Sequence, residues 1–292
     1  MERKFVVPES LYPFQSHWHP YQDGCIHYLD EGSGPVVVCL HGNPTWSFLY
    51  RNIIKDLRSD FRVIVPDYPG FGFSVVPSGY GFSIAEHAAA IEDFLNALDL
   101  KKVILVVQDW GGPIGFSWAV RHPERVAAIA LANTLLASPK GSLRLLAKVI
   151  GGFVGRWLIL NKNYFVKKLM PSVIENSENK TEEIRKAYIQ QFPTKESRFP
   201  IWMFTRQVLE ASSYLDEIRS HMQVLQDKPA ELLFGTKDPA LGYERDITFW
   251  ENLLPNHHTV RLPHANHYVQ EDDPTAFVEA IKRAAQRAGI VF

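Results

Sequence analysis

Residues 103–115 constrain the fold of this chain more than any other stretch. The segment reads Val-Ile-Leu-Val-Val-Gln-Asp-Trp-Gly-Gly-Pro-Ile-Gly, so a run of five apolar residues leads into a single carboxylate and then into small residues. A run of this kind is typical of a strand buried on both faces of a parallel sheet. The glycines that follow allow a helix to pack closely against that strand. The sequence therefore predicts a tight strand-to-helix turn, called a nucleophile elbow, that holds Asp109 above the edge of a sheet.

The first 134 residues alternate between buried strands and helices. The apolar runs and helical patterns that predict them lie at 36–40, 46–57, 61–65, 112–121 and 126–131. Ser83, with Glu86 three residues later, forms a capping box for a helix that runs to about residue 98. Residues 14–30 predict an opening antiparallel hairpin, and Asp67 is assigned to a turn. Alternation of this kind predicts an α/β fold with a mainly parallel sheet and helices on both faces.

The alternation stops at about residue 135 and resumes at about residue 227, with strands at 229–235 and 258–262 and a closing helix at 274–288. The segment between has helical patterns but no convincing strand. Its most apolar part, 145–160, contains charges and three glycines, which predicts an amphipathic helix pair rather than a bilayer span. We therefore expect a core domain of residues 1–134 and 227–292 and an inserted helical cap of residues 135–226 over a pocket. Four aromatic side chains are expected inside this cap: Phe153, Trp157, Trp202 and Phe204.

Charge and cysteine content argue against several kinds of partner. The 292 residues carry a formal net charge of −1, without a long block of like charge. We therefore expect neither a nucleic acid nor a membrane as a partner. The first eight residues have no apolar run of a signal peptide, which favours a cytoplasmic location. Of two cysteines, Cys39 lies inside an apolar strand, so neither a disulfide nor a metal site is expected. The sequence gives no indication of the oligomeric state.

Four sets of polar residues follow the predicted parallel strands. They are Asn43, the pair Asp109 and Trp110, Asp238, and His267. Because reactive groups collect at the carboxyl ends of the strands in such sheets, these side chains are expected to meet. Nucleophile, acid and histidine follow one another in the order of the α/β-hydrolase triad.

A carboxylate in the nucleophile position restricts the reaction. Attack of Asp109 on an acyl carbon would give a mixed anhydride, whereas attack on an electrophilic saturated carbon gives a stable alkyl ester. The leaving group then carries charge into an apolar pocket, where N–H donors must meet it, and Trp110 and Asn43 carry such donors without an ionised group. In a second step, His267 activates water to attack the ester while Asp238 orients the imidazole. The backbone N–H groups of Trp110 and Asn43 are the expected oxyanion hole.

Four motifs together resemble those of the haloalkane dehalogenases. They are His41-Gly-Asn-Pro-Thr-Trp46, Gln108-Asp-Trp-Gly-Gly112, Gly235-Thr-Lys-Asp238 and His267-Tyr-Val-Gln-Glu-Asp272. The resemblance covers nearly the whole chain and is weak in the cap. It implies an α/β-hydrolase core, Asp109 as nucleophile, and a halide held by Trp110 and Asn43. It also implies a small apolar halogenated substrate and neither a metal nor an organic cofactor. Some relatives place the catalytic acid after the strand that follows the elbow; here Asn133 occupies that region, which favours Asp238.

Other interpretations of the same residues remain open. Asp109 could cap the following helix, Asn43 and Asp238 could be turn residues beside proline, and Trp110 could be a core aromatic. Epoxide hydrolases share the triad but need two cap tyrosines. Three tyrosines lie in the predicted cap: Tyr164, Tyr188 and Tyr214. β-Lactone decarboxylases of olefin biosynthesis use the same elbow aspartate, and a non-catalytic ligand receptor with the same fold is an alternative from a different class.

Overall fold

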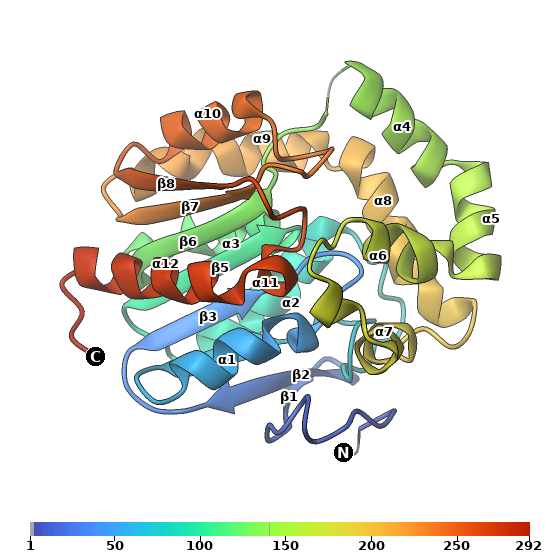
Figure 1. Cartoon of the computed structure of the whole chain (residues 1–292), viewed down its shortest axis with the longest axis horizontal. Helices are drawn as coiled ribbons and strands as arrows, with labels where there is room; N and C mark the ends of the chain where they lie inside the picture. Colours follow the sequence, from blue (N-terminus) through green and yellow to red (C-terminus); the bar gives the residue numbers. More distant parts are fainter. Residues whose placement is uncertain (1–2, 140) are drawn as a thin grey trace.

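The computed structural model describes residues 3–139 and 141–292, and one eight-stranded sheet forms its centre (Figure 1). The strands are β1 (His17–Tyr21), β2 (Gly24–Glu31), β3 (Val36–Leu40), β4 (Arg62–Pro66), β5 (Val103–Asp109), β6 (Val126–Thr134), β7 (Ala230–Gly235) and β8 (His257–Leu262). Their order across the sheet is β1-β2-β4-β3-β5-β6-β7-β8. The pairs β1–β2 and β2–β4 are antiparallel, and every later neighbouring pair is parallel. The predicted hairpin and mainly parallel sheet are confirmed.

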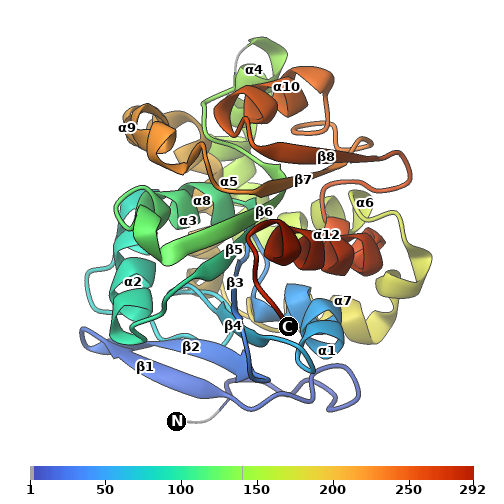
Figure 2. The same ribbon diagram turned by 90° about the vertical axis from the view of Figure 1, so that its left-hand side faces the viewer.

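Helices cover both faces of this sheet. Helices α2 and α3 lie on one face, and α1 and α12 lie on the other (Figure 2). Their bounds are α1 (Arg51–Leu57), α2 (Ile84–Ala97), α3 (Gly111–Ala119) and α12 (Pro274–Arg287). The capping box at the start of α2 is present, because the Glu86 backbone N–H donates to the Ser83 hydroxyl at 3.2 Å and the Glu86 side chain reaches back. The ends of these four helices lie within about five residues of the predicted ends.

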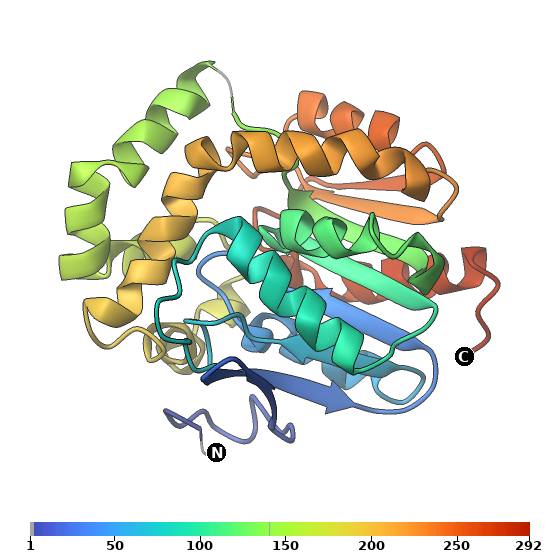
Figure 3. The same ribbon diagram turned by 180° about the vertical axis from the view of Figure 1, so that it is seen from behind.

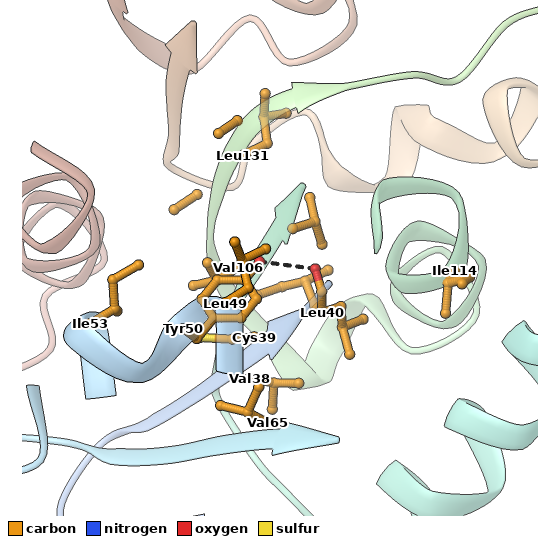
Figure 4. Close-up of a cluster of buried hydrophobic side chains, with 14 of the residues drawn as sticks. Val38, Cys39, Leu40, Leu49, Tyr50, Ile53, Val65, Val106, Ile114 and Leu131 are labelled. Carbon is orange, nitrogen blue, oxygen red and sulfur yellow. Dashed lines mark hydrogen bonds between the residues drawn. The ribbon is translucent and has the colours of Figure 1, made fainter. Parts of the chain in front are cut away.

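The core lies where the central strands meet the helices on either side (Figure 4). Val38, Cys39, Leu40 and Val106 have no exposed surface, as expected for parallel strands covered on both faces. The Tyr50 hydroxyl donates to the Leu40 carbonyl at 2.9 Å, which satisfies this polar group within the apolar cluster. Burial of each such aliphatic side chain contributes about 1.5–3 kcal/mol. This packing fixes the strand ends that carry the polar residues.

A helical segment separates β6 from β7 along the chain, although the two strands are neighbours in the sheet (Figure 3). Its helices are α4 (Gly141–Gly151), α5 (Phe153–Lys162), α6 (Met170–Ser172), α7 (Glu182–Ile189), α8 (Phe199–Glu210) and α9 (Ser212–His221), and its described residues form no strand. The predicted helix pair is α4 and α5, which lie at the outer edge and pack against α8 (Figures 1 and 3). An α/β core with an inserted helical cap is confirmed. Within the described ranges, no helix has the length and apolar content needed to cross a membrane.

Two sequence-based expectations need correction. The prediction of an interior position was wrong for two cap aromatics, since Phe153 is 82% exposed and Trp157 is 48% exposed, whereas Phe204 is buried. The physical reason is that no described element covers the outer side of α4 and α5 (Figures 1 and 3). Helix α10 (Glu244–Leu253) was not predicted at all. Its apolar face is narrow, because only Ile247 and Trp250 are buried.

Candidate active site

Asp109 stands at the turn between β5 and α3. Strand β5 ends at Asp109 and α3 begins at Gly111. Asp109 has a φ of 50°, a left-handed conformation that is strained for a residue with a side chain. A Cβ atom at Gly42 would collide with the Asp109 carboxylate, and one at Gly111 would collide with the Leu40 carbonyl. The strained turn and the close glycines together lift the Asp109 carboxylate out of the sheet.

His267 lies between two carboxylates. Its Nδ1 is 2.7 Å from Asp238 Oδ2, and its Nε2 is 3.5 Å from Asp109 Oδ2. Burial opposes the charged imidazolium, but the Asp238 charge and hydrogen bonding to Asp109 outweigh it and raise the pKa of His267 to about 10. Burial also opposes ionisation of Asp238, yet the neighbouring His267 holds the pKa of that carboxyl below its usual value. The geometry therefore favours an imidazolium held between two anions.

Two further groups fix the Asp238 carboxylate. Its Oδ2 accepts from Asn133 Nδ2 at 2.9 Å, and its Oδ1 accepts from the Ala240 backbone N–H at 2.8 Å. Asn133 Oδ1 in turn accepts from the Gly235 backbone N–H at 2.8 Å. The sequence interpretation used Asn133 only to move the catalytic acid elsewhere and missed its contact with Asp238. Its place at the carboxyl end of β6 was the signal that could have revealed this contact.

Asn43 and Trp110 carry N–H groups beside the same cavity as the Asp109 carboxylate. The Asn43 backbone N–H donates to Asp109 Oδ1 at 2.8 Å. The Asn43 side-chain Nδ2 is 3.5 Å from the Ile201 carbonyl, a distance at the outer limit of a hydrogen bond. Trp110 packs edge-on against Phe204, with ring centroids 5.9 Å apart. Its indole N–H has no hydrogen-bond partner among the described residues. Both side chains therefore keep donor capacity for a ligand.

All five predicted site residues border one cavity of about 560 Å³: Asn43, Asp109, Trp110, Asp238 and His267. Most of the remaining wall is apolar and comes from the cap, from the loop after β6 and from α10. It includes Leu136, Ala147, Ile150, Phe165, Val173 and Phe249. Such walls suit an apolar ligand, and they make an unpaired charge inside the cavity costly. The sequence therefore predicted which side chains meet, although they come from distant parts of the chain.

A buried ion pair connects the histidine loop with the core and the cap. Glu271 lies in α11 (Val269–Asp272), four residues after His267, and accepts from Arg51 of α1 at 2.6 and 2.8 Å. Tyr188 of α7 donates to the same carboxylate, and the Asn179 amide donates to the Glu271 carbonyl. These contacts join residues 83 to 220 positions apart in the chain, and the sequence reasoning missed them. They hold the loop that carries His267 against two other parts of the fold.

A second carboxylate–imidazole pair lies away from the cavity. Asp67, which the sequence assigned to a turn, has no exposed surface, and its Oδ2 is 2.7 Å from His27 Nδ1. It also accepts from the backbone N–H groups of Ser47 at 2.7 Å and Phe73 at 3.0 Å. None of these four residues lines the cavity. Asp67 therefore connects β2 with two loops of the core through its carboxylate, whereas the sequence predicted only a turn residue.

Comparisons with known proteins show which families this chain is similar to. A family model described as alpha/beta hydrolase fold matches residues 35–274. Haloalkane dehalogenase 2 of Mycobacterium tuberculosis (strain ATCC 25618 / H37Rv) is 38% identical over 283 residues, which cover 96% of this chain and 98% of that protein. A cis-3-alkyl-4-alkyloxetan-2-one decarboxylase of Shewanella oneidensis is 28% identical over 285 residues, which cover 94% of this chain and 89% of that protein.

Solved structures show the same likeness in three dimensions. Haloalkane dehalogenase DatA from Agrobacterium tumefaciens C58 matches with a TM-score of 0.84 and 26% identity over 94% of this chain and 97% of that chain. The sheet, the elbow and the family match define an α/β-hydrolase-fold protein. Within that fold, the chain belongs to the haloalkane dehalogenase family, to which the oxetan-2-one decarboxylases are related. The resemblance carried by the four sequence motifs is thereby confirmed.

Proposed function

We propose that this protein hydrolyses carbon–halogen bonds of small apolar molecules to an alcohol, a halide ion and a proton. One observation carries the proposal: the Asp109 carboxylate borders the same apolar cavity as the Trp110 indole N–H, which has no partner among the described residues. In this proposal, residues 1–134 and 227–292 form the catalytic core and residues 135–226 form the cap that sets the substrate range. The cytoplasmic location and the absence of a nucleic-acid partner stay predictions.

In the first step, Asp109 attacks the carbon that bears the halogen. Oδ1 accepts from the Asn43 backbone N–H at 2.8 Å, a closer contact than the 3.5 Å between Oδ2 and His267 Nε2, so Oδ2 is the better attacking atom. A C–O bond forms, and the electrons of the C–X bond leave with the halide. The halide enters an apolar site, where the Trp110 indole N–H and the Asn43 amide N–H receive it. In comparable anion sites, removal of one such donor costs about 2.7–4 kcal/mol of transition-state stabilisation.

In the second step, water attacks the carbonyl carbon of the Asp109 ester. If Oδ2 carries the alkyl group, Oδ1 becomes the carbonyl oxygen, and the Asn43 N–H already points at it. The backbone N–H of Trp110 is the second proposed donor to the oxyanion. His267 takes a proton from the water, and Asp238, 2.7 Å from Nδ1, stabilises the imidazolium that forms. Collapse of the tetrahedral intermediate releases the alcohol and restores the carboxylate.

The charge on Asp109 couples the two steps. With Asp109 ionised, its hydrogen bonding and its charge contribute to the raised pKa of His267. Esterification removes that charge, so the pKa of His267 falls and the imidazolium releases a proton. The neutral imidazole can then act as a general base. The released proton is the one that accompanies halide formation in the overall reaction.

A second candidate is the decarboxylation of a β-lactone, which the 28% identity to the oxetan-2-one decarboxylase favours. A β-lactone also offers a saturated carbon with an oxygen leaving group, so the same nucleophile can serve. Epoxide hydrolysis has less support. None of the three cap tyrosines is among the described residues that line the cavity, and two are engaged elsewhere, Tyr188 with Glu271 and Tyr214 with Ser117 at 2.6 Å.

The test compares the products of two reactions. Purified protein is incubated with 1-bromobutane and, separately, with a cis-3,4-dialkyl-oxetan-2-one, and halide and carbon dioxide are measured. We expect catalytic halide release that Asp109→Asn abolishes, because an amide is a poor nucleophile towards saturated carbon. Rapid carbon dioxide release without halide release would instead establish the decarboxylase. If neither product forms from a range of electrophiles, the ligand-receptor alternative stands.

A further inference from the structure

The outer side of α4 and α5 exposes large apolar side chains. Leu145 and Val149 in α4 are 65% and 53% exposed, and Phe153 and Trp157 in α5 are 82% and 48% exposed. Within each helix the two residues are four positions apart, so they share one helix face. The two helices pack against each other at the edge of the cap (Figure 1). We call these four residues, with the neighbouring Arg144, Lys148 and Arg156, the cap-edge face.

The segment that carries the cap-edge face has charged side chains of one sign. Residues 141–174 contain six basic residues and no Asp or Glu, whereas the whole chain has a net charge of −1. None of the six pairs with a carboxylate among the described residues: Arg144, Lys148, Arg156, Lys162, Lys167 and Lys168. The expectation of no membrane partner rested on the net charge of the chain, which conceals this separation.

Aromatic side chains and cations are interleaved at this edge. The Arg156 guanidinium lies 5.0 Å from the Trp202 ring centroid, and Lys162 Nζ lies 5.4 Å from that of Trp157. Exposed Trp, Phe and Leu beside Lys and Arg are typical of helices that lie in the interface of a bilayer. An apolar surface of this kind is uncommon on a soluble monomer unless something binds to it.

The positive charge of the cap-edge face distinguishes between two possible binding partners, a second copy of this chain and an anionic bilayer. A second copy joined about a two-fold axis would bring two basic faces together, and like charges opposed across an interface are unfavourable. An anionic bilayer offers phosphate groups for the cations and acyl chains for the apolar side chains. We propose that the cap-edge face docks on an anionic lipid surface, with Phe153 and Trp157 among the headgroups and Arg144 and Lys148 against the phosphates.

Docking in this way places the cavity beside the bilayer. The side of α4 that faces inward contributes Ala147 and Ile150 to the cavity wall. Only one helix therefore separates the docked surface from the cavity. Apolar molecules concentrate in the bilayer, so the proposed substrates would reach the protein from the membrane. This consequence rests on the proposed function, whereas the lipid binding itself does not.

The binding test uses vesicles of two compositions. The full chain is sedimented with phosphatidylcholine vesicles and with vesicles that also contain phosphatidylglycerol. We expect about tenfold or more preference for the anionic vesicles at low salt, and weaker binding at high salt because the Debye length shortens. Equal sedimentation with both vesicles, or none with either, would overturn the proposal.

Two double variants of the cap-edge face test whether this surface binds the lipid. Arg144→Glu with Lys148→Glu should reduce binding at least about tenfold, and Phe153→Ser with Trp157→Ser should do the same. All four side chains are exposed and none lines the cavity, so halide release from 1-bromobutane should stay unchanged. The matched control is Lys101→Glu with Lys102→Glu, at the opposite end of β5 from Asp109, which should keep binding.

Three results would reject this surface. Undiminished vesicle binding by either double variant of the cap-edge face would contradict the proposal, as would equal loss in the Lys101 and Lys102 control. A dimer that forms in solution and is dissociated by Phe153→Ser with Trp157→Ser would identify a second copy as the occupant. Because lipid binding is measured without a substrate, failure of the proposed hydrolysis would leave this test intact.

Discussion

Replacement of Asp238 by asparagine removes one charge and keeps the shape of the side chain. Asp238 Oδ2 is 2.7 Å from His267 Nδ1 and 2.9 Å from Asn133 Nδ2, and its Oδ1 accepts from the Ala240 N–H at 2.8 Å. An asparagine has one acceptor oxygen, so its amide NH₂ must face at least one N–H donor in either orientation. The variant therefore disturbs both the charge beside His267 and the direction of its Nδ1–H.

The Asp238→Asn substitution is expected to slow the second chemical step, hydrolysis of the ester. Burial opposes the imidazolium, and Asp238 is the largest influence that raises the pKa of His267 to about 10, so Asp238→Asn lowers that pKa. In other triads, the same change reduces turnover by about 10⁴ through the wrong imidazole tautomer. We expect ester hydrolysis to slow by about 10³–10⁴. Alkylation of Asp109 should persist, because the nucleophile and the N–H donors are unchanged.

A rapid-mixing assay of halide release separates the two steps. Asp238→Asn should release one halide per active site in a burst, followed by very slow turnover. The control is Asp216→Asn, which changes an exposed carboxylate that pairs with Arg219 at 2.7 Å and does not line the cavity. That variant should alter turnover by about twofold at most. Full steady-state turnover by Asp238→Asn, or loss of its burst, would refute the assigned role.

Three further predictions follow from the same contacts. Trp110→Phe keeps an aromatic side chain but removes the indole N–H, so the halide burst should slow by about 10²–10³, as rapid mixing will show. Glu271→Gln leaves Arg51 buried without its anion and should lower the free energy of unfolding by about 3–5 kcal/mol; a loss below about 1 kcal/mol in urea unfolding would contradict this. Because the pKa of His267 is raised from 6.5 to about 10, its stabilising contribution is fully present below pH 6.5 and is lost as the pH rises through about 10. The stability difference between the wild type and His267→Gln should shrink over that range.

Short sequence patterns were enough to predict the strands and helices that form the core. The apolar run before Asp109 and the glycines after it specify a buried strand and a close-packed helix within thirteen residues. Ser83 and Glu86 specify the start of α2 through a capping box that spans residues 83–86. The site followed from the same strands, because the carboxyl ends of neighbouring parallel strands meet at one edge of the sheet.

Contacts between residues that lie far apart in the sequence could not be predicted from local patterns. The pair of Arg51 and Glu271 joins residues 220 positions apart, and no local pattern marks either as a partner. Phe153 and Trp157 have the spacing of an interior face, yet they point outward because no described element covers that side of α5. The burial of an amphipathic helix depends on which elements pack beside it.

The covalent ester on Asp109 is the central claim, and a single trapping measurement tests it. His267→Gln removes the general base while its amide can still donate to Asp238. The variant is mixed with 1-bromobutane, digested, and analysed by mass spectrometry. We predict that the peptide containing Asp109 gains the mass of one butyl group at stoichiometric yield, alongside one equivalent of bromide. An unmodified Asp109 peptide in a variant that binds the substrate and still releases bromide would contradict the covalent mechanism.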